Sequence, residues 1–231
     1  MLASYSTVLE KLSIVLASQS PRRASILKNN LGLNFEIVVS NFAENIDKST
    51  CPSPHDYVLQ TAHMKASDVA LSLIDKQKQL KLLPDLIISA DTIVVRDNAI
   101  LEKPENEQAA RDMLKSLSGR SHKVLTGISI YYKNTSFLSD LSNTNTNTQP
   151  EYYSYEDFVQ ETTVKFTNLN DNIINAYVAT GEPMDKAGSY GAQGLGSSLV
   201  ESFDGCYFNV VGFPVNRFCI ELIQILERYK G

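Results

Sequence analysis

The chain has 231 residues, a mass of 25.6 kDa and 43% hydrophobic residues, enough to bury a sizeable core in one large domain or a two-lobed unit. Its net charge of −5 and isoelectric point of about 5.3 argue against a nucleic-acid-binding protein, because such surfaces are normally basic. A small polyanionic substrate needs only a local cationic pocket, so that class of ligand stays open.

The three cysteines and three histidines share no spacing typical of a metal site. Free, reduced thiols in a cytosolic protein are the simplest interpretation of an odd number of scattered cysteines. No run approaches the roughly 18 apolar residues of a membrane span, and the first residues are too polar for a secretory signal. We therefore expect a cytoplasmic protein that binds neither membrane nor nucleic acid polymer.

Strand and helix patterns alternate along the chain, which predicts an α/β fold. In the first half, the predicted elements are a strand at Ile14–Leu16, a helix at 23–31, a strand at 35–39 and a helix from Pro54 to about Ile74. A very apolar strand follows at 86–88. After Ser89-Ala90-Asp91-Thr92 comes a second apolar run at 93–95.

In the second half, the predicted elements are a helix at 105–117, strands at 124–132 and 158–166, a helix at 170–180, an extended segment at 198–211 and a helix from Pro214. Between the two strands lies a tract rich in Asn and Thr that has no means of building a core. It predicts a flexible hairpin insertion at about 134–154. We expect a single domain over 1–231 that carries this insertion.

The segment Ser18-Gln19-Ser20-Pro21-Arg22-Arg23 follows the first strand and opens a helix. Proline suits a first helical turn, and the N–H groups and dipole of such a junction attract anions. Two adjacent arginines would then bind phosphate through charge-assisted hydrogen bonds. The alternative is an ordinary capped helix start with solvated arginines, and this segment alone does not decide between them.

Lys65 and Asp91 are charged residues in apolar surroundings. Lys65 falls on the apolar stripe of the helix that starts at Pro54, where it either faces an anionic partner in a cleft or extends its ammonium to water at the edge of the stripe. Asp91 directly follows the most apolar strand. At the carboxyl end of a central strand it could bind Mg²⁺ or polarise a water, whereas the alternative is a turn or helix cap.

Further segments carry weaker signals. Glu44 lies in the loop after the second predicted strand, and Lys103 either reaches a phosphate or lies in an exposed turn. The segment 187–196 is rich in glycine, which allows close backbone approach to a ligand, but it lacks the pattern of a P-loop or a dinucleotide fingerprint. Gln193 within it has the donor and the acceptor needed to read a base edge.

Together these motifs resemble the Maf family of nucleoside triphosphate pyrophosphatases. The motifs are Ser18-x-Ser20-Pro21-Arg22-Arg23, Ala90-Asp91-Thr92, Leu101-Glu102-Lys103-Pro104, Ser118-Gly119, Asp185-Lys186-Ala187-Gly188 and Gly191-Ala192-Gln193-Gly194-Leu195-Gly196. They occur in the family's order from about Ile14 to the C-terminal helix. The resemblance implies an elongated mixed β-sheet flanked by helices, with two lobes around a nucleotide cleft, similar to inosine triphosphate pyrophosphatases.

The resemblance also implies hydrolysis of a nucleotide between its α and β phosphates, with Mg²⁺ or Mn²⁺ as the divalent metal, in a homodimer. The phosphate-binding residues that it implies are Ser18, Arg22, Arg23, Lys65 and Lys103. Asp91 and Glu44 would bind the metal and handle the water, with Asp91 as the proton acceptor.

Three residues resemble the family branch that acts on dTTP and UTP, namely Arg22 directly after Pro21, Thr92 after Asp91, and Gln193. Thr92 and Gln193 would then read the pyrimidine. We expect a house-cleaning dTTP/UTP pyrophosphatase that also removes modified pyrimidine nucleotides. The alternatives are a pyrophosphatase for non-standard purine or 7-methylguanosine triphosphates, and a non-catalytic regulator of cell division.

Overall fold

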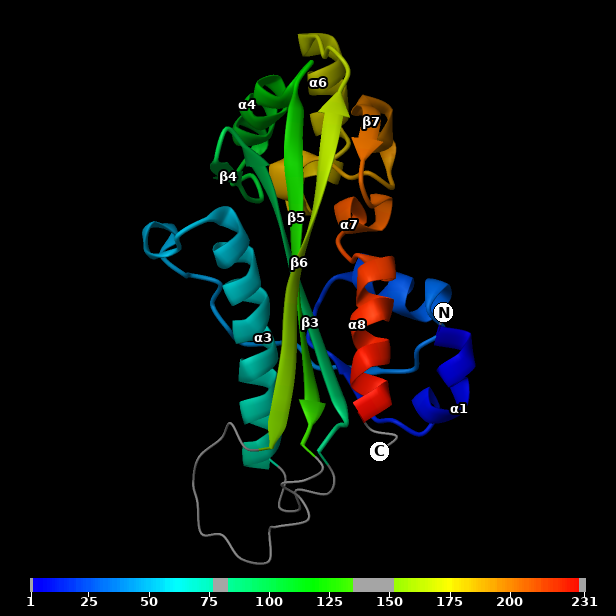
Figure 1. Cartoon of the computed structure of the whole chain (residues 1–231). Helices are drawn as coiled ribbons and strands as arrows, with labels where there is room; N and C mark the ends of the chain where they lie inside the picture. Colours follow the sequence, from blue (N-terminus) through cyan, green and yellow to red (C-terminus); the bar gives the residue numbers. More distant parts are fainter. Residues whose placement is uncertain (1, 77–82, 135–151, 229–231) are drawn as a thin grey trace, which may run out of the picture.

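The computed structural model describes residues 2–76, 83–134 and 152–228, which form an open mixed β-sheet with helices on both faces (Figure 1). In these residues the sheet has seven strands in the order β2-β1-β3-β5-β6-β7, and β4 pairs with the far end of β3. Strand β1 pairs in parallel with β2 and β3, and the other pairs are antiparallel. The predicted α/β fold with a mixed sheet is confirmed.

The strands are β1 (Ile14–Leu16), β2 (Glu36–Ile37), β3 (Leu86–Arg96), β4 (Ala99–Leu101), β5 (Ser121–Lys133), β6 (Tyr153–Phe166) and β7 (Val200–Asp204). The α-helices are α1 (Ser6–Leu9), α2 (Pro21–Ser25), α3 (Pro54–Lys76), α4 (Glu107–Leu117), α6 (Asp171–Ala179), α7 (Tyr207–Val211) and α8 (Val215–Arg228). Shorter helical turns are η1 (Leu2–Tyr5), η2 (Ile26–Asn30), η3 (Lys48–Thr50), η6 (Glu182–Asp185), η7 (Ala187–Ser189) and η8 (Leu195–Leu199). The predicted helices near 54–74, 105–117 and 170–180 and the one after Pro214 are confirmed.

Alternation of side chains along β1 and β3 divides the core into two layers. Leu16 and Ile88 pack in a cluster that includes α8, whereas Val15 and Ile87 pack in a cluster that includes α3. The two helices therefore lie on opposite faces of the sheet (Figure 1). Because both faces are covered, these strand segments are apolar throughout and not alternating.

A separate cluster covers the far ends of β5 and β6. It joins Leu114 of α4 and Ile174 of α6 to Phe166 and Tyr190. Helices therefore pack at two places along one long sheet, which gives the molecule a lobe at each end (Figure 1).

Strand β3 is longer than the sequence pattern predicts. The apolar runs at 86–88 and 93–95 belong to one strand, because β5 pairs with every residue from 86 to 95 and keeps the polar residues between the runs in the ladder. Asp91 lies in the middle of β3. The prediction that it ends the strand is wrong.

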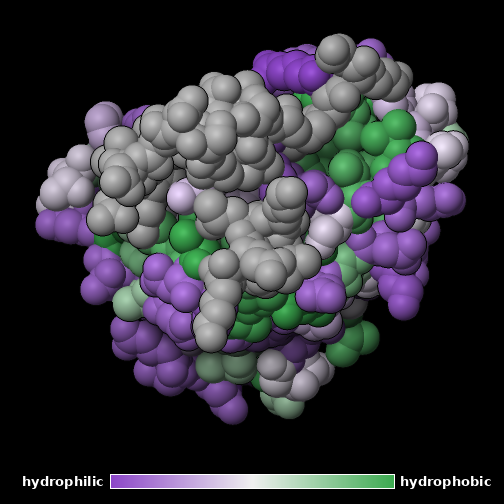
Figure 2. All heavy atoms as spheres, turned by 90° about the horizontal axis from the view of Figure 1, so that it is seen from below, coloured by the Kyte–Doolittle hydropathy of each residue, from purple (hydrophilic) through white to green (hydrophobic). Residues whose placement is uncertain are grey.

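Two other predicted boundaries differ. The extended segment at 198–211 is only partly extended, since Tyr207–Val211 forms helix α7. Strand β6 begins at Tyr153, well before the predicted start at 158, because its polar residues pair with β5. Most of the predicted insertion, residues 135–151, lies outside the described residues. Seen from below the view of Figure 1, the described residues show hydrophobic and hydrophilic side chains interspersed (Figure 2).

Candidate functional site

A cleft opens at a gap in the sheet beside the middle of β3. One edge of β3 pairs with β1 as far as Ile88 and with β4 from Val94 onward. Among the described residues, the stretch 89–93 therefore has no strand partner on this edge and pairs with β5 on the other. The cleft has a volume of about 940 Å³. Asp91 therefore lies just beyond the carboxyl end of the parallel strand β1, and ligands of open α/β sheets bind at such a place.

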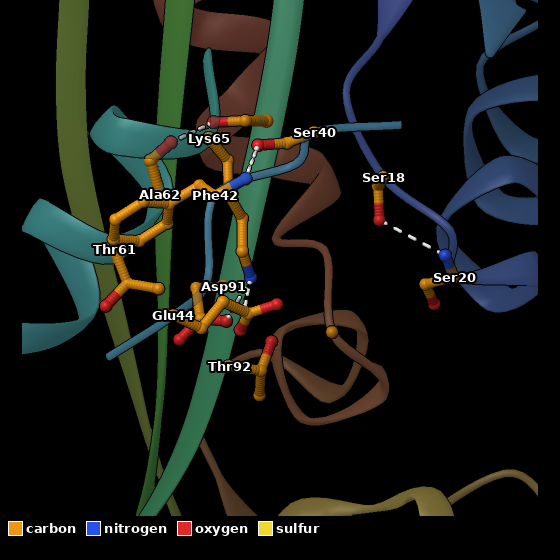
Figure 3. A network of polar contacts seen from close by, with 12 residues as sticks. Ser18, Ser20, Ser40, Phe42, Glu44, Thr61, Ala62, Lys65, Asp91 and Thr92 are labelled. Atoms are coloured by element: carbon orange, nitrogen blue, oxygen red, sulfur yellow. Dashed lines mark hydrogen bonds and ion pairs between the residues drawn. The ribbon is translucent and has the colours of Figure 1, made fainter. Parts of the chain in front are cut away.

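Every predicted site residue lines this cleft. They are Ser18, Arg22, Arg23, Glu44, Lys65, Asp91, Thr92, Lys103 and Gln193. Figure 3 shows how side chains from α3, β3 and the segment after β1 face one space. Glu44, Lys103 and Gln193 are solvent-exposed, and the others are buried or half-buried. The roles that the resemblance implies for these residues stay predictions.

The Arg23 guanidinium is fixed by three acceptors. Its Nε donates to the carbonyl of Gly212 at 3.0 Å, its Nη1 to Ser18 Oγ at 3.2 Å and its Nη2 to Thr92 Oγ1 at 3.0 Å. The helix start that carries it is capped as predicted, with Ser20 Oγ accepting from the Arg23 N–H. Burial lowers the pKa of Arg23, yet an arginine keeps its charge at neutral pH. The arginine is therefore held in place beside the cleft.

Arg22 points to the other side of the cleft. Its Nη1 lies 3.1 Å from Oδ2 of Asp185, which also pairs with Lys186 at 2.6 Å. All three side chains line the cleft. Burial acts to raise the pKa of Asp185, but hydrogen bonds from Lys186 and Arg22 outweigh it and lower the pKa. The Arg22–Asp185 pair thus connects α2 with η6.

Lys65 faces inward, and the alternative of a solvated ammonium is excluded. Its Nζ lies 2.8 Å from Asp91 Oδ1 and 2.8 Å from Glu44 Oε2, and the residue is 8% exposed (Figure 3). Two of its three protons are thereby directed to carboxylates. The two ion pairs hold the Asp91 and Glu44 carboxylates close together around one ammonium.

Gly127 allows α3 to approach the sheet this closely. It is the β5 partner of Asp91, and a Cβ atom there would lie 2.6 Å from the Val58 carbonyl oxygen of α3. A side chain at this position would push α3 away from β5. The distance between Lys65 and Asp91 depends on that contact.

Glu44 has φ of 50°, a left-handed backbone conformation that is uncommon outside glycine. Asp68 of α3 fixes the start of its loop, since its Oδ2 accepts from Ser40 Oγ at 2.9 Å and from the Asn41 N–H at 2.8 Å. Backbone strain of this kind is often found at functional sites.

Glu102 is a cleft residue to which the sequence assigned no role. It accepts from the Tyr57 hydroxyl and from Lys48 Nζ, each at 2.7 Å, and so joins α3, the Glu44 loop and the start of the Lys103 segment. Burial acts to raise the pKa of Glu102, but the bonds from Lys48 and Tyr57 lower it overall. Burial and the bond to Glu102 raise the pKa of Tyr57. Its place in the Leu101-Glu102-Lys103-Pro104 motif was the only sequence signal.

Glu182 is the second missed residue, and it holds the glycine-rich segment in place. Its carboxylate accepts from the Tyr177 hydroxyl at 2.9 Å and from the N–H groups of Leu195 at 2.8 Å and Gly196 at 3.1 Å. Burial acts to raise the pKa of Glu182, but these hydrogen bonds lower it overall. The bonds fix the loop that presents Gln193 to the cleft. No local pattern in the sequence predicts them.

Asp91 and Glu44 are the predicted metal ligands. Both lie within 2.8 Å of the same ammonium, so the two carboxylates are close enough to share one cation. Within residues 2–76, 83–134 and 152–228, no group of three His, Cys, Asp or Glu side chains is arranged to hold a metal. This donor set suits Mg²⁺, which commonly takes one or two carboxylates and completes its shell with water and substrate phosphates.

None of the helices in the described part of the chain is both long enough and apolar enough to cross a membrane.

Comparisons with known proteins cover most of the chain, and residues 13–225 match the family described as Maf-like protein. A human protein, named "probable bifunctional dTTP/UTP pyrophosphatase/methyltransferase protein", is 46% identical over 212 residues; these cover 92% of this chain but 32% of the human protein. The chain therefore spans about a third of that relative's length.

Two bacterial relatives match over nearly their whole length. The "dTTP/UTP pyrophosphatase" of Clostridium perfringens (strain 13 / Type A) is 41% identical over 223 residues, which cover 94% of this chain and 97% of that protein. The protein of the same name from Bacillus cereus (strain AH820) is 40% identical over 211 residues, covering 91% of this chain and 94% of that protein. The resemblance seen in the sequence motifs is confirmed, and the chain belongs to the Maf-like protein family.

Proposed function

We propose that this chain hydrolyses dTTP and UTP between the α and β phosphates, releasing the nucleoside monophosphate and pyrophosphate. The observation that carries the proposal is a cleft whose lining brings Arg22, Arg23, Lys65 and Lys103 together with the Asp91 and Glu44 carboxylates. The names of the bacterial relatives support the choice of nucleotides.

The cationic side chains account for triphosphate binding. A nucleoside triphosphate carries about four negative charges, and Arg22, Arg23, Lys65 and Lys103 supply matching positive ones. Ser18 adds a donor, since its Oγ already accepts from the Ser20 N–H and from Arg23 and its proton can turn to a phosphate oxygen. Charge-assisted hydrogen bonds of this kind stabilise both the bound substrate and the charge that develops in the transition state.

Asp91 is the proposed proton acceptor. Lys65 binds its Oδ1, which fixes the carboxylate, while Oδ2 can take a proton from the water that attacks the α phosphorus. A divalent metal held by Asp91 and Glu44 would supply Lewis-acid polarisation of the phosphates and a more acidic water. The leaving pyrophosphate would stay paired with the cationic side chains until it is released.

The residues proposed to recognise the base lie on both sides of the cleft. Gln193 lies on the loop fixed by Glu182, with an amide that both donates and accepts, as a uracil or thymine edge requires. Thr92 lies on β3, where it accepts a hydrogen bond from Arg23. Thr92 and Arg22 also contribute to the choice of nucleotide.

A panel of nucleotides tests the proposal. The purified protein is incubated with Mg²⁺ or Mn²⁺ and with dTTP, UTP, CTP, inosine triphosphate or 7-methylguanosine triphosphate, and pyrophosphate release is measured. We expect the highest kcat/KM for dTTP and UTP, and loss of turnover in Asp91→Asn. Preference for either purine would contradict the substrate assignment. Equal turnover in Asp91→Asn would contradict the catalytic one.

We further propose a cytoplasmic homodimer. Light scattering after gel filtration gives the mass of the assembly, and fractionation of cells that express the tagged chain gives its location. A mass of 25.6 kDa would identify a monomer instead.

A further inference from the structure

A chain of hydrogen bonds runs from Arg23 into the protein, away from the cleft. Arg23 Nη2 lies 3.0 Å from Thr92 Oγ1, which lies 3.0 Å from Thr126 Oγ1, which in turn lies 3.0 Å from the carbonyl oxygen of Asn209. Thr126 and Asn209 are fully buried, and the described residues that line the cleft include neither.

The direction of each bond in this chain follows from its two ends. The Asn209 carbonyl can only accept, so the Thr126 hydroxyl proton points to it. Since that proton is used, Thr92 must donate its own proton to Thr126. Thr92 then accepts from the guanidinium, which can only donate. Thr92 therefore presents a lone pair, and no proton, to the cleft.

The same bonds fix the orientation of the guanidinium. A guanidinium has five N–H donors, and Thr92, Ser18 and Gly212 take three of them from Arg23. One donor remains on each terminal nitrogen. Two such donors in one plane suit the oxygens of a phosphate, and removal of one of the three partners would hold the guanidinium less firmly in that plane.

Asn209 is itself held by the sheet. Its side-chain nitrogen donates to the Val124 carbonyl of β5 and to Thr162 Oγ1 of β6, each at 3.0 Å. The backbone carbonyl oxygen of Asn209 accepts from the Thr126 hydroxyl and from the Gly212 N–H, each at 3.0 Å, which uses both lone pairs. Helix α7 thus meets Arg23 twice, directly through the Gly212 carbonyl and indirectly through Asn209, Thr126 and Thr92.

We propose that Thr126 and Asn209 are positioning residues for phosphate binding: through Thr92 they fix the plane in which Arg23 presents its two remaining N–H donors. The inference rests on the proposed function in one respect only, that the bound anion is a polyphosphate. It predicts that Thr92 and Thr126 act on affinity for the phosphates even when the ligand carries no base.

The test uses inorganic tripolyphosphate, which has the phosphates and no base. Calorimetry measures its Kd for the wild-type protein and for Thr126→Val, which removes the hydroxyl and nearly keeps the shape. We expect the Kd of Thr126→Val to rise about tenfold, because Arg23 would be less well oriented for its charge-assisted hydrogen bonds to phosphate. Thr126→Ser should restore the Kd to within about twofold of the wild-type value. Thr61→Val is the matched control, because Thr61 is equally buried and its hydroxyl bonds only the Tyr57 carbonyl of its own helix among the described residues.

Thr92→Val keeps the proposal testable if Thr126→Val fails to fold. If Thr92 only reads the base, its replacement will leave the tripolyphosphate Kd unchanged. If Thr92 fixes Arg23 as proposed, its replacement will raise that Kd. Wild-type affinity in a folded Thr126→Val or Thr92→Val protein would overturn the inference. If the wild type binds tripolyphosphate and the variants bind it less, but no nucleotide is hydrolysed, the proposed function fails and the inference stands.

Discussion

The two sides of the cleft are built in different ways. On one side, which we call the phosphate wall, Arg23, Lys65 and Asp91 come from α2, α3 and β3, and both Arg23 and Lys65 bind side chains of β3. The other side, the loop wall, consists of residues 182–196, which form short helical turns, and the Glu182 carboxylate accepts from the Leu195 and Gly196 N–H groups of this segment.

The proposed reaction accounts for this difference. Attack on a phosphorus atom tolerates little displacement, and regular elements hold the groups of the phosphate wall to fixed positions. The loop wall instead packs closely on the sheet through glycine, since Gly188 has φ of 66°, which favours glycine, and an added Cβ there would lie 2.7 Å from the Val94 side chain of β3.

The largest expected effect comes from the phosphate wall. Asp91→Asn removes the proposed proton acceptor and lowers kcat by about 10²- to 10⁴-fold, measured as pyrophosphate release from dTTP. Asp185→Asn is the matched control, since it removes a carboxylate that lines the same cleft from the loop wall. We expect it to change kcat by less than about tenfold. Equal losses in both variants would remove the distinction between the walls.

Gly127→Ala tests whether close packing of α3 sets the phosphate wall. The new methyl group overlaps the Val58 carbonyl, so the free energy of unfolding falls by about 1–3 kcal/mol. Because α3 carries Lys65, kcat falls as well. Urea denaturation and dTTP turnover at a temperature where the variant is folded measure the two effects. Wild-type values of both would show that the contact does not position Lys65.

Glu182→Gln tests the loop wall. The Glu182 carboxylate accepts hydrogen bonds from two backbone N–H groups, and the amide nitrogen of glutamine cannot accept one. The ordered conformation of the loop is therefore destabilised by about 1–3 kcal/mol. We expect KM for dTTP to rise while kcat stays within about threefold, because the phosphate wall is intact. A fall in kcat with unchanged KM would contradict the division of roles.

The smallest expected effect is a pH dependence of stability that comes from His122, which contacts the loop wall at Tyr190. His122 is 3% exposed, its Nε2 lies 2.8 Å from the Tyr190 hydroxyl, and burial lowers its pKa from 6.5 to about 4. The unfolded chain binds the proton more readily. This contribution to stability is therefore complete above pH 6.5 and is lost as the pH falls toward 4.

As the pH falls from 7 to 5.5, His122 is protonated in the unfolded chain but not in the folded protein, which lowers the free energy of unfolding by about 1 kcal/mol. Denaturation curves at the two pH values measure the loss, and His122→Phe should make it smaller. An unchanged pH dependence in that variant would assign the effect to other groups.

Sequence reasoning worked where a local pattern carries the answer. The apolar stripe placed Lys65 on the inward-facing side of its helix but left open whether its ammonium meets an anion or water, and Ser20-Pro21 placed the start of α2. It failed for the position of Asp91, because only pairing with β5 shows that the strand continues. Glu102 and Glu182 were missed because their partners, Tyr57 and Gly196, lie 45 and 14 residues away in the chain.

The most direct test of the central claim is the fate of the oxygen from water. The protein hydrolyses dTTP in ¹⁸O-labelled water, and mass spectrometry locates the label. Water activated by Asp91 at the α phosphorus places ¹⁸O in dTMP, with unlabelled pyrophosphate as the second product. Label in pyrophosphate, or release of orthophosphate as the first product, would contradict the assignment of this cleft.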